Sequence, residues 1–240
     1  MSFLTAFWKK LCFANYAVDP QILKPYLPAH TELDFFKGKC YVSLVGFLFD
    51  DVKLKGISIP FHKRFEEINL RFYVRHFDGK FWKRGTVFIS EIVKKPAIAW
   101  VANRIYNEKY SVFKMHYKHD LTNEENFISY GLHFENNWQL LQIATAPVAT
   151  AYESNSVTAF ITEHFWGYSK KTELESWEYE VKHPLWKSYK VLNYDVIFDF
   201  GAVYGKLFED LSQRSPDSVH CMEGSAVSIE GKKVIKEQLR

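Results

Sequence analysis

Alternation of apolar and polar residues at a period of two recurs along most of this chain. It is clearest in segment 65–74, whose even positions from 68 onward are apolar and whose positions 67, 69 and 71 are Glu, Asn and Arg. Successive side chains of a β-strand point to opposite faces of a sheet, so this pattern predicts strands. With roughly ten strands, a sheet tends to curl or close rather than stay flat. We therefore expect a mainly β (α+β) fold.

The individual elements follow from the same pattern and from turn residues. The predicted strands are 11–18, 32–36, 40–49, 66–77, 82–93, 111–118, 127–134, 138–145, 174–182, 189–200, 218–222 and 225–229. About three peripheral helices are expected from apolar stripes and capping residues, at 20–27, 156–166 and 202–211. A further amphipathic segment opens at Pro96 and should pack on the sheet.

Composition narrows the class of protein. No linker, charge block or repeat divides the 240 residues, which predicts a single domain over residues 1–240. The net charge of +3, with both signs interspersed, gives no field that would attract nucleic acid or an anionic membrane, and no apolar run reaches the length of a membrane span. Cys12, Cys40 and Cys221 show neither zinc-site nor disulfide spacing. We expect a cytoplasmic protein with free thiols.

Several common functional motifs are absent. The chain contains no G-x-G-x-x-G, G-x-x-x-x-G-K-[ST] or G-x-S-x-G sequence, which disfavours dinucleotide-binding, nucleotide-binding and serine hydrolase classes. His116 and His119 are three residues apart, but on a strand that spacing places them on opposite faces, where they cannot chelate one metal as neighbours. We expect no cofactor and no metal.

The strongest candidate site is the polar row Glu67, Asn69 and Arg71, which shares one face of a strand. This face could meet water, as one face of an antiparallel sheet commonly does. It could instead line the inside of a curled sheet, where Arg71 would hold a carboxylate and Glu67 would act as an acid or base. His164 lies on the apolar stripe of the 156–166 helix and faces inward, either as a core residue or as part of a cavity wall.

A second candidate is the polar and aromatic cluster at residues 103–110. Its residues that could contact a ligand are Arg104, Tyr106, Asn107, Glu108 and Lys109. The cluster stands where a helix gives way to a strand, so its cations could equally cap unpaired helix carbonyls.

Short sequence phrases resemble the YqjF-like family of uncharacterised bacterial proteins. They are FANY (13–16), VDP (18–20), YVSLVGF (41–47), FEEINLR (65–71), YNE (106–108), EHFWGY (163–168), PDSV (216–219) and EGS (223–225). The resemblance runs in order through nearly the whole chain. The family is grouped with the acetoacetate decarboxylase-like superfamily, which implies a cone-shaped or closed antiparallel β-barrel around a central cavity.

The resemblance also implies roles for individual residues. Acetoacetate decarboxylases form a Schiff base between a lysine and a β-keto acid. Glu67 resembles the glutamate of their Tyr-Asn-Glu motif, and Arg104 resembles the arginine of their Arg-Glu motif. No adjacent lysine pair follows Arg104, and Lys109 matches the Schiff-base lysine only in a shifted register.

The expected function is therefore the binding of a small carboxylate, keto or aromatic ligand in a cone cavity, with a decarboxylase-related, lyase-like enzyme as one form of it. Two alternatives stay open. The cavity could be a non-catalytic binding module, or the chain could be a self-associating scaffold that forms a homo-oligomer.

Overall fold

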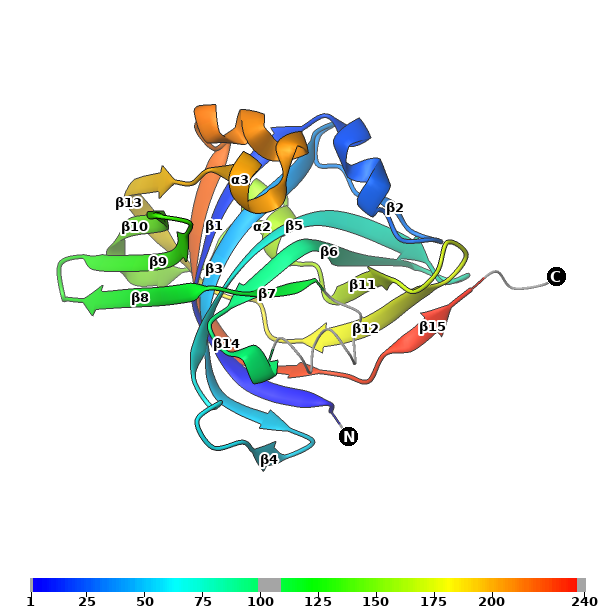
Figure 1. Cartoon of the computed structure of the whole chain (residues 1–240), viewed down its shortest axis with the longest axis horizontal. Helices are drawn as coiled ribbons and strands as arrows, with labels where there is room; N and C mark the ends of the chain where they lie inside the picture. Colours follow the sequence, from blue (N-terminus) through cyan, green and yellow to red (C-terminus); the bar gives the residue numbers. More distant parts are fainter. Residues whose placement is uncertain (1, 99–108, 237–240) are drawn as a thin grey trace.

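A computed structural model of the chain describes residues 2–98 and 109–236, and it is mainly β (Figure 1). Its strands are β1 (Leu4–Val18), β2 (Glu32–Leu33), β3 (Cys40–Leu54), β4 (Ile57–Ser58), β5 (Phe65–Phe77), β6 (Trp82–Val93), β7 (Tyr110–Val112), β8 (Lys114–Leu121), β9 (Asn126–Phe134), β10 (Asn137–Thr150), β11 (Trp166–Lys170), β12 (Ser176–Lys182), β13 (Ser188–Ile197), β14 (Ser218–Ile229) and β15 (Lys233–Ile235). The helices are α2 (Val157–Thr162), α3 (Phe200–Tyr204), and the 3₁₀ helices η1 (Pro20–Tyr26) and η2 (Lys206–Gln213).

Seven of the strands form a hydrogen-bonded ring. The order is β12, β11, β6, β5, β3, β1 and β14, and the ring closes because β14 pairs again with β12. The closing register places Val181 opposite Ile229 and Lys182 opposite Ser228. All neighbours in the ring are antiparallel except β11 and β6. Helices η1, α3 and η2 gather at one end of the molecule (Figure 1).

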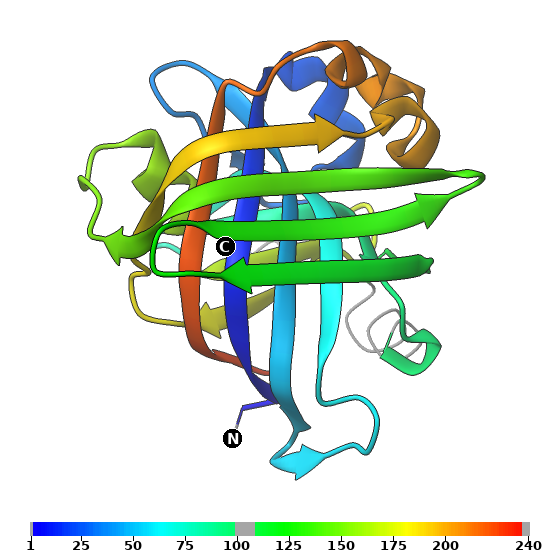
Figure 2. The same ribbon diagram turned by 90° about the vertical axis from the view of Figure 1, so that its left-hand side faces the viewer.

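A second layer covers one side of the ring. Strands β13, β10, β9 and β8 continue the sheet beyond β14 and run across β14, β1, β3 and β5, as the gold and green strands of Figure 2 show. The two layers approach closely where Gly46 on β3 meets Tyr130 on β9, because a Cβ at Gly46 would lie only 2.8 Å from the tyrosine ring. The Tyr130 hydroxyl also donates to the carbonyl of Lys10 on β1 at 2.8 Å.

Strand β5 is buried on both faces, although its residues alternate between apolar and polar. Ile68, Leu70 and Phe72 pack in the core between the two layers. Phe65 and Tyr73 point the other way, into a second core inside the ring. The polar row lies on that inner face, so the interpretation in which it meets water is wrong. The second layer covers the outer face of β5, and the polar row faces the inside of the ring.

The structure corrects several predicted elements. The helix expected at 156–166 ends at Thr162, because residues from Trp166 onward join the sheet as β11, a strand the sequence did not predict. The helix expected at 202–211 is two short helices separated by Gly205, whose φ of +101° interrupts the helical backbone. The strands expected at 218–222 and 225–229 are one continuous strand, β14.

Two further expectations concern particular segments. Most of the amphipathic segment that opens at Pro96 falls in residues 99–108, outside the described part of the chain. Within the described ranges, we find no helix whose length and apolar character would let it cross a membrane.

Candidate functional site

The inner face of the ring encloses a cavity of about 180 Å³, which we call the ring cavity. Side chains from β1, β3, β5, β6, β7, β11, β12 and β14 line it, together with residues at the end of α2. Most of its wall is apolar or aromatic, with a small number of polar groups set into it. This combination is typical of small-molecule sites.

The polar row of β5 lies on the wall of the ring cavity. Glu67, Asn69 and Arg71 are 2%, 1% and 9% exposed. They point inward because they share the parity of Phe65 and Tyr73, which pack inside the ring. Three polar groups on one strand are thus held away from solvent, where they must find partners in the protein or in a ligand.

Both carboxyl oxygens of Glu67 accept hydrogen bonds. Asn69 Nδ2 donates to Oε1 at 2.9 Å, and the hydroxyl of Tyr110 on β7 donates to Oε2 at 2.9 Å. Burial raises the pKa of Glu67 to about 7, although these two hydrogen bonds and the positive charge of Arg71 oppose the rise. Glu67 therefore changes protonation state near neutral pH, as a general acid or base must.

Arg71 is a buried cation. One terminal guanidinium nitrogen donates to the carbonyl of Ile161 in α2 at 3.2 Å, while Nε is buried without a hydrogen-bond partner. The guanidinium carbon lies 5.1 Å from the ring centroid of Phe13 and 5.5 Å from that of Tyr73. No carboxylate of the described residues forms an ion pair with Arg71. The cavity wall thus presents a planar cation, which stays protonated in proteins, without an ion-pair partner among the described residues.

His164 lies on the cavity wall just after α2. Its Nε2 is 3.1 Å from Oδ2 of Asp34, and the same oxygen accepts from Nε of Arg84 at 2.7 Å. Burial lowers the pKa of His164 to about 4, even though the hydrogen bond to Asp34 opposes that change. Despite burial, the bonds from His164 and Arg84 hold the pKa of Asp34 below its usual range.

The residues proposed from sequence separate into three groups. Glu67, Asn69, Arg71 and His164 come together around the ring cavity. Lys109 does not join them: its Nζ lies 4.7 Å from the ring centroid of Tyr26 in η1, and it is not among the described cavity-lining residues. Arg104, Tyr106, Asn107 and Glu108 lie outside the described residues.

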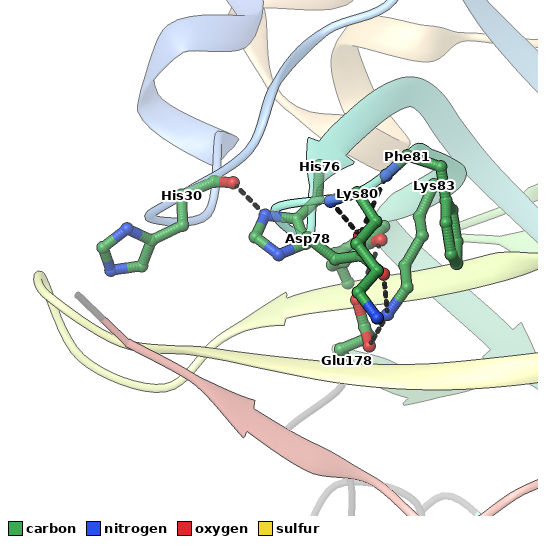
Figure 3. A network of polar contacts seen from close by, with 8 residues as sticks. His30, His76, Asp78, Lys80, Phe81, Lys83 and Glu178 are labelled. Atoms are coloured by element: carbon green, nitrogen blue, oxygen red, sulfur yellow. Dashed lines mark hydrogen bonds and ion pairs between the residues drawn. The ribbon is translucent and has the colours of Figure 1, made fainter. Parts of the chain in front are cut away.

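Lysine is missing from the described wall of the ring cavity. None of the lining residues that the structure describes is a lysine, and segment 99–108 contains none in its sequence. Lys83 contacts a residue of the wall, with Nζ 4.3 Å from the ring centroid of Trp166. Its ammonium is paired, at 2.9 Å from Glu178 and 3.5 Å from Asp78, in a network that ties the β5–β6 turn to β12 (Figure 3).

Sequence reasoning missed three polar residues at or behind the site, Glu91, Asp34 and Arg84, and it placed Tyr110 in the 103–110 cluster without a contact to Glu67. Glu91 is 3% exposed and lines the ring cavity from β6. An acidic residue inside the apolar run of 87–93 was an available signal for it. Asp34 contacts His164 across 130 positions, and no local pattern encodes such a contact. The described residues contain no cluster of three or more His, Cys, Asp or Glu that could hold a metal ion.

Comparisons with known proteins place this geometry in context. The model of the DUF2071 family, described as "Uncharacterized conserved protein (COG2071)", matches residues 5–226. Uncharacterized protein YqjF of Bacillus subtilis (strain 168) is 33% identical over 70 residues, which is 29% of this chain and 29% of that protein. The curated relative is therefore matched over less than a third of its length.

Solved structures match nearly the whole chain. Enduracididine biosynthesis enzyme MppR complexed with pyruvate has a TM-score of 0.68 at 11% identity, covering 98% of this chain and 91% of that one. Acetoacetate decarboxylase from Legionella pneumophila has a TM-score of 0.64 at 12% identity, with 98% and 88% covered. An acetoacetate decarboxylase-like enzyme from Sphingomonas wittichii RW1 has a TM-score of 0.65 at 10% identity, with 99% and 95% covered. At these identities the likeness establishes the fold.

Proposed function

Because this chain belongs to the DUF2071 family of uncharacterised conserved proteins and has an acetoacetate decarboxylase-like fold, we propose that its ring cavity binds a small carboxylate that carries an apolar or aromatic group. In this proposal Arg71 pairs with the carboxylate and Glu67 exchanges a proton with the bound molecule. The apolar wall takes the rest of the ligand.

The buried guanidinium of Arg71 carries the proposal. A buried charge is costly unless it is paired, and the protein supplies Arg71 with a carbonyl and two aromatic faces but no described carboxylate. Its Nε has no acceptor among the described residues. A ligand carboxylate would neutralise the charge and accept from Nε and a terminal nitrogen together, the forked geometry that guanidinium groups favour.

Glu67 supplies the acid–base chemistry. With a pKa of about 7, a substantial part of the population is protonated and a substantial part is ionised at neutral pH. The protonated form can donate to a ligand oxygen, and the ionised form can remove a proton next to a carbonyl. Asn69 and Tyr110 fix the carboxyl group through one oxygen each, which limits the reorganisation that proton transfer needs.

The proposed chemistry does not use a lysine amine. Schiff-base formation requires an amine within reach of the carbonyl carbon, and no described lysine lines the ring cavity. One structural neighbour, the enzyme MppR, forms a complex with pyruvate, which supports a keto acid or a related small acid as the kind of ligand. The missing lysine also favours a second candidate, in which the cavity binds such an acid without transforming it.

Calorimetric titration tests the binding proposal. We expect 3-phenylpropanoate to bind and its neutral amide, 3-phenylpropanamide, to bind about 10- to 100-fold more weakly, because the amide lacks the charge that pairs with Arg71. Arg71→Met should remove this difference. Arg75→Met is the matched control, because Arg75 is on the same face of β5 but pairs with Glu32 at the surface. Equal binding of acid and amide to the unmodified protein would refute the proposal.

Deuterium exchange separates catalysis from binding alone. Pyruvate incubated with the protein in heavy water should lose the proton signal of its methyl group faster than in buffer, and Glu67→Gln should abolish the acceleration. Binding of the acids without accelerated exchange would favour the non-catalytic candidate.

A further inference from the structure

One nitrogen of the His164 ring has no hydrogen-bond partner in the part of the chain that the structure describes. Nε2 is occupied by Asp34, whereas Nδ1 is buried and makes no hydrogen bond with any group of the structure. The ring is clamped in place, with centroid distances of 4.7 Å to Tyr73 and 5.2 Å to Phe160. A buried polar atom without a partner in a cavity-lining side chain calls for an explanation, and a bound ligand is one.

The contact with Asp34 decides what Nδ1 can do. Asp34 is held in its ionised form by Arg84 and His164, so its Oδ2 can only accept, and the shared ring proton must sit on Nε2. His164 is neutral at physiological pH because burial lowers its pKa to about 4. Nδ1 is consequently a fixed hydrogen-bond acceptor, and only a group that donates can satisfy it.

An aromatic wall lines another part of the ring cavity. Trp8 packs edge-on against Phe47 and Phe49, with ring centroids 5.1 and 5.8 Å apart, and is 6.1 Å from Trp186. The indole nitrogen of Trp8 is buried without a hydrogen-bond partner. We call these four residues the aromatic wall. Flat aromatic groups pack favourably against such surfaces in offset or edge-on geometry.

Arg71 is near His164, because both pack against Tyr73: the guanidinium carbon is 5.5 Å and the imidazole centroid 4.7 Å from the tyrosine ring centroid. Burial is the main cause of the lowered pKa of His164, and the positive charge of Arg71 adds to it. Burial and the charge of Arg71 also lower the pKa of His183 to about 4. His183 stacks on Trp186 with a centroid distance of 4.1 Å. One cavity therefore offers a cation, a fixed acceptor and an aromatic surface.

From this arrangement we infer that the ligand is an aromatic hydroxy acid: its carboxylate pairs with Arg71, its hydroxyl donates to Nδ1 of His164, and its ring rests on the aromatic wall. The inference rests on the proposed function and deepens it by naming the ligand class. His164 is the residue that distinguishes a hydroxy acid from the same acid without the hydroxyl, because a methylene at that position would leave Nδ1 unpaired.

Two acids that differ only in the hydroxyl test the inference. We expect the better-fitting enantiomer of 3-phenyllactate to bind the unmodified protein about 3- to 10-fold more tightly than 3-phenylpropanoate in calorimetric titrations. His164→Phe keeps an aromatic ring but has no acceptor, and it should lower this ratio to about one. His220→Phe is the matched control, since His220 is half-buried, has a pKa that burial lowers to about 4, and is not among the described lining residues of the ring cavity.

The outcomes separate this inference from the proposed function. If neither acid binds, the proposed function fails and the inference fails with it. If both bind equally well, the inference is overturned and the carboxylate site stands. If His164→Phe does not fold, the ¹⁵N resonance of Nδ1 in the unmodified protein gives the answer. It should shift on addition of 3-phenyllactate and not on addition of 3-phenylpropanoate, and equal responses to the two acids would overturn the inference.

Discussion

Replacement of Glu67 by Gln gives a stability difference that depends on pH in a defined direction. Below pH 4.5 the Glu67 carboxyl is protonated in both the folded and the unfolded chain. Between pH 4.5 and about 7 the unfolded chain ionises first, because burial raises the folded-state pKa to about 7. Unfolding then releases a proton, so the free energy of unfolding falls as the pH rises through this window. Above it the loss is complete.

The size of the loss follows from the same pKa. A change from the usual 4.5 to about 7 corresponds to about 3 kcal/mol, since each tenfold change in proton affinity is worth about 1.4 kcal/mol. Glutamine has nearly the same shape and is neutral at every pH. We expect Glu67→Gln to match the unmodified protein in stability at pH 4.5 and to exceed it by about 3 kcal/mol at pH 8.

Urea denaturation followed by tryptophan fluorescence measures this difference between pH 4.5 and 8.5. Glu173→Gln controls for the removal of one carboxylate, because the Glu173 side chain is 85% exposed on a turn. A difference between Glu67→Gln and the unmodified protein that stays constant over the whole range would refute the account of Glu67 as a buried carboxyl with a raised pKa.

Three further predictions concern the cavity and the fold. Borohydride treatment with pyruvate or acetoacetate should leave the intact mass unchanged, because no described lysine lines the ring cavity; an adduct that disappears in Lys109→Ala would overturn this. Leu70→Ala should lower the free energy of unfolding by about 2–5 kcal/mol, because Leu70 is fully buried between the layers, whereas Leu174→Ala, at a residue 78% exposed, should change it by less than about 0.5 kcal/mol. In thermal denaturation, Gly224→Ala should lower stability more than Gly79→Ala. Both glycines have positive φ, but only at Gly224 would the new methyl group meet a backbone carbonyl oxygen, at 1.9 Å. Equal losses of stability would contradict this prediction.

The strands of the ring could be predicted where local signals agree. The hairpin of β5 and β6 is nearly where the sequence placed it, because clear alternation flanks the Asp78-Gly79 turn. Strand β14 was divided in two because Glu223-Gly224 has the composition of a turn. In the structure Gly224 has φ +86° and lies inside a continuous strand, opposite Lys9 on β1. A glycine at such a position can either form a turn or allow a neighbouring strand to approach closely. The position of the neighbouring strand decides between the two, and local sequence does not contain it.

The site could be predicted only as far as strand parity reaches. Alternation placed Glu67, Asn69 and Arg71 on one face, but their direction depends on the layer that covers the opposite face, which local sequence does not contain. Parity also explains why Tyr110 reaches Glu67 while Lys109, its neighbour in the chain, contacts Tyr26 elsewhere. The contact between Asp34 and His164 depends on how the ring closes, and no local sequence pattern encodes it.

The inward position of His164 was predicted from a helical stripe that is only partly real. Helix α2 ends at Thr162, two residues before His164. The histidine still faces inward, in the short connection between α2 and β11, where it lines the ring cavity. The prediction was correct for the residue and wrong for the element that positions it.

A crystal structure of the protein grown with 3-phenyllactate tests the central claim most directly. We expect a ligand inside the ring cavity, with its two carboxylate oxygens at hydrogen-bond distance, about 3 Å, from the Arg71 guanidinium. A ligand bound outside the ring cavity, or one inside it whose carboxylate points away from Arg71, would contradict the proposed role of Arg71.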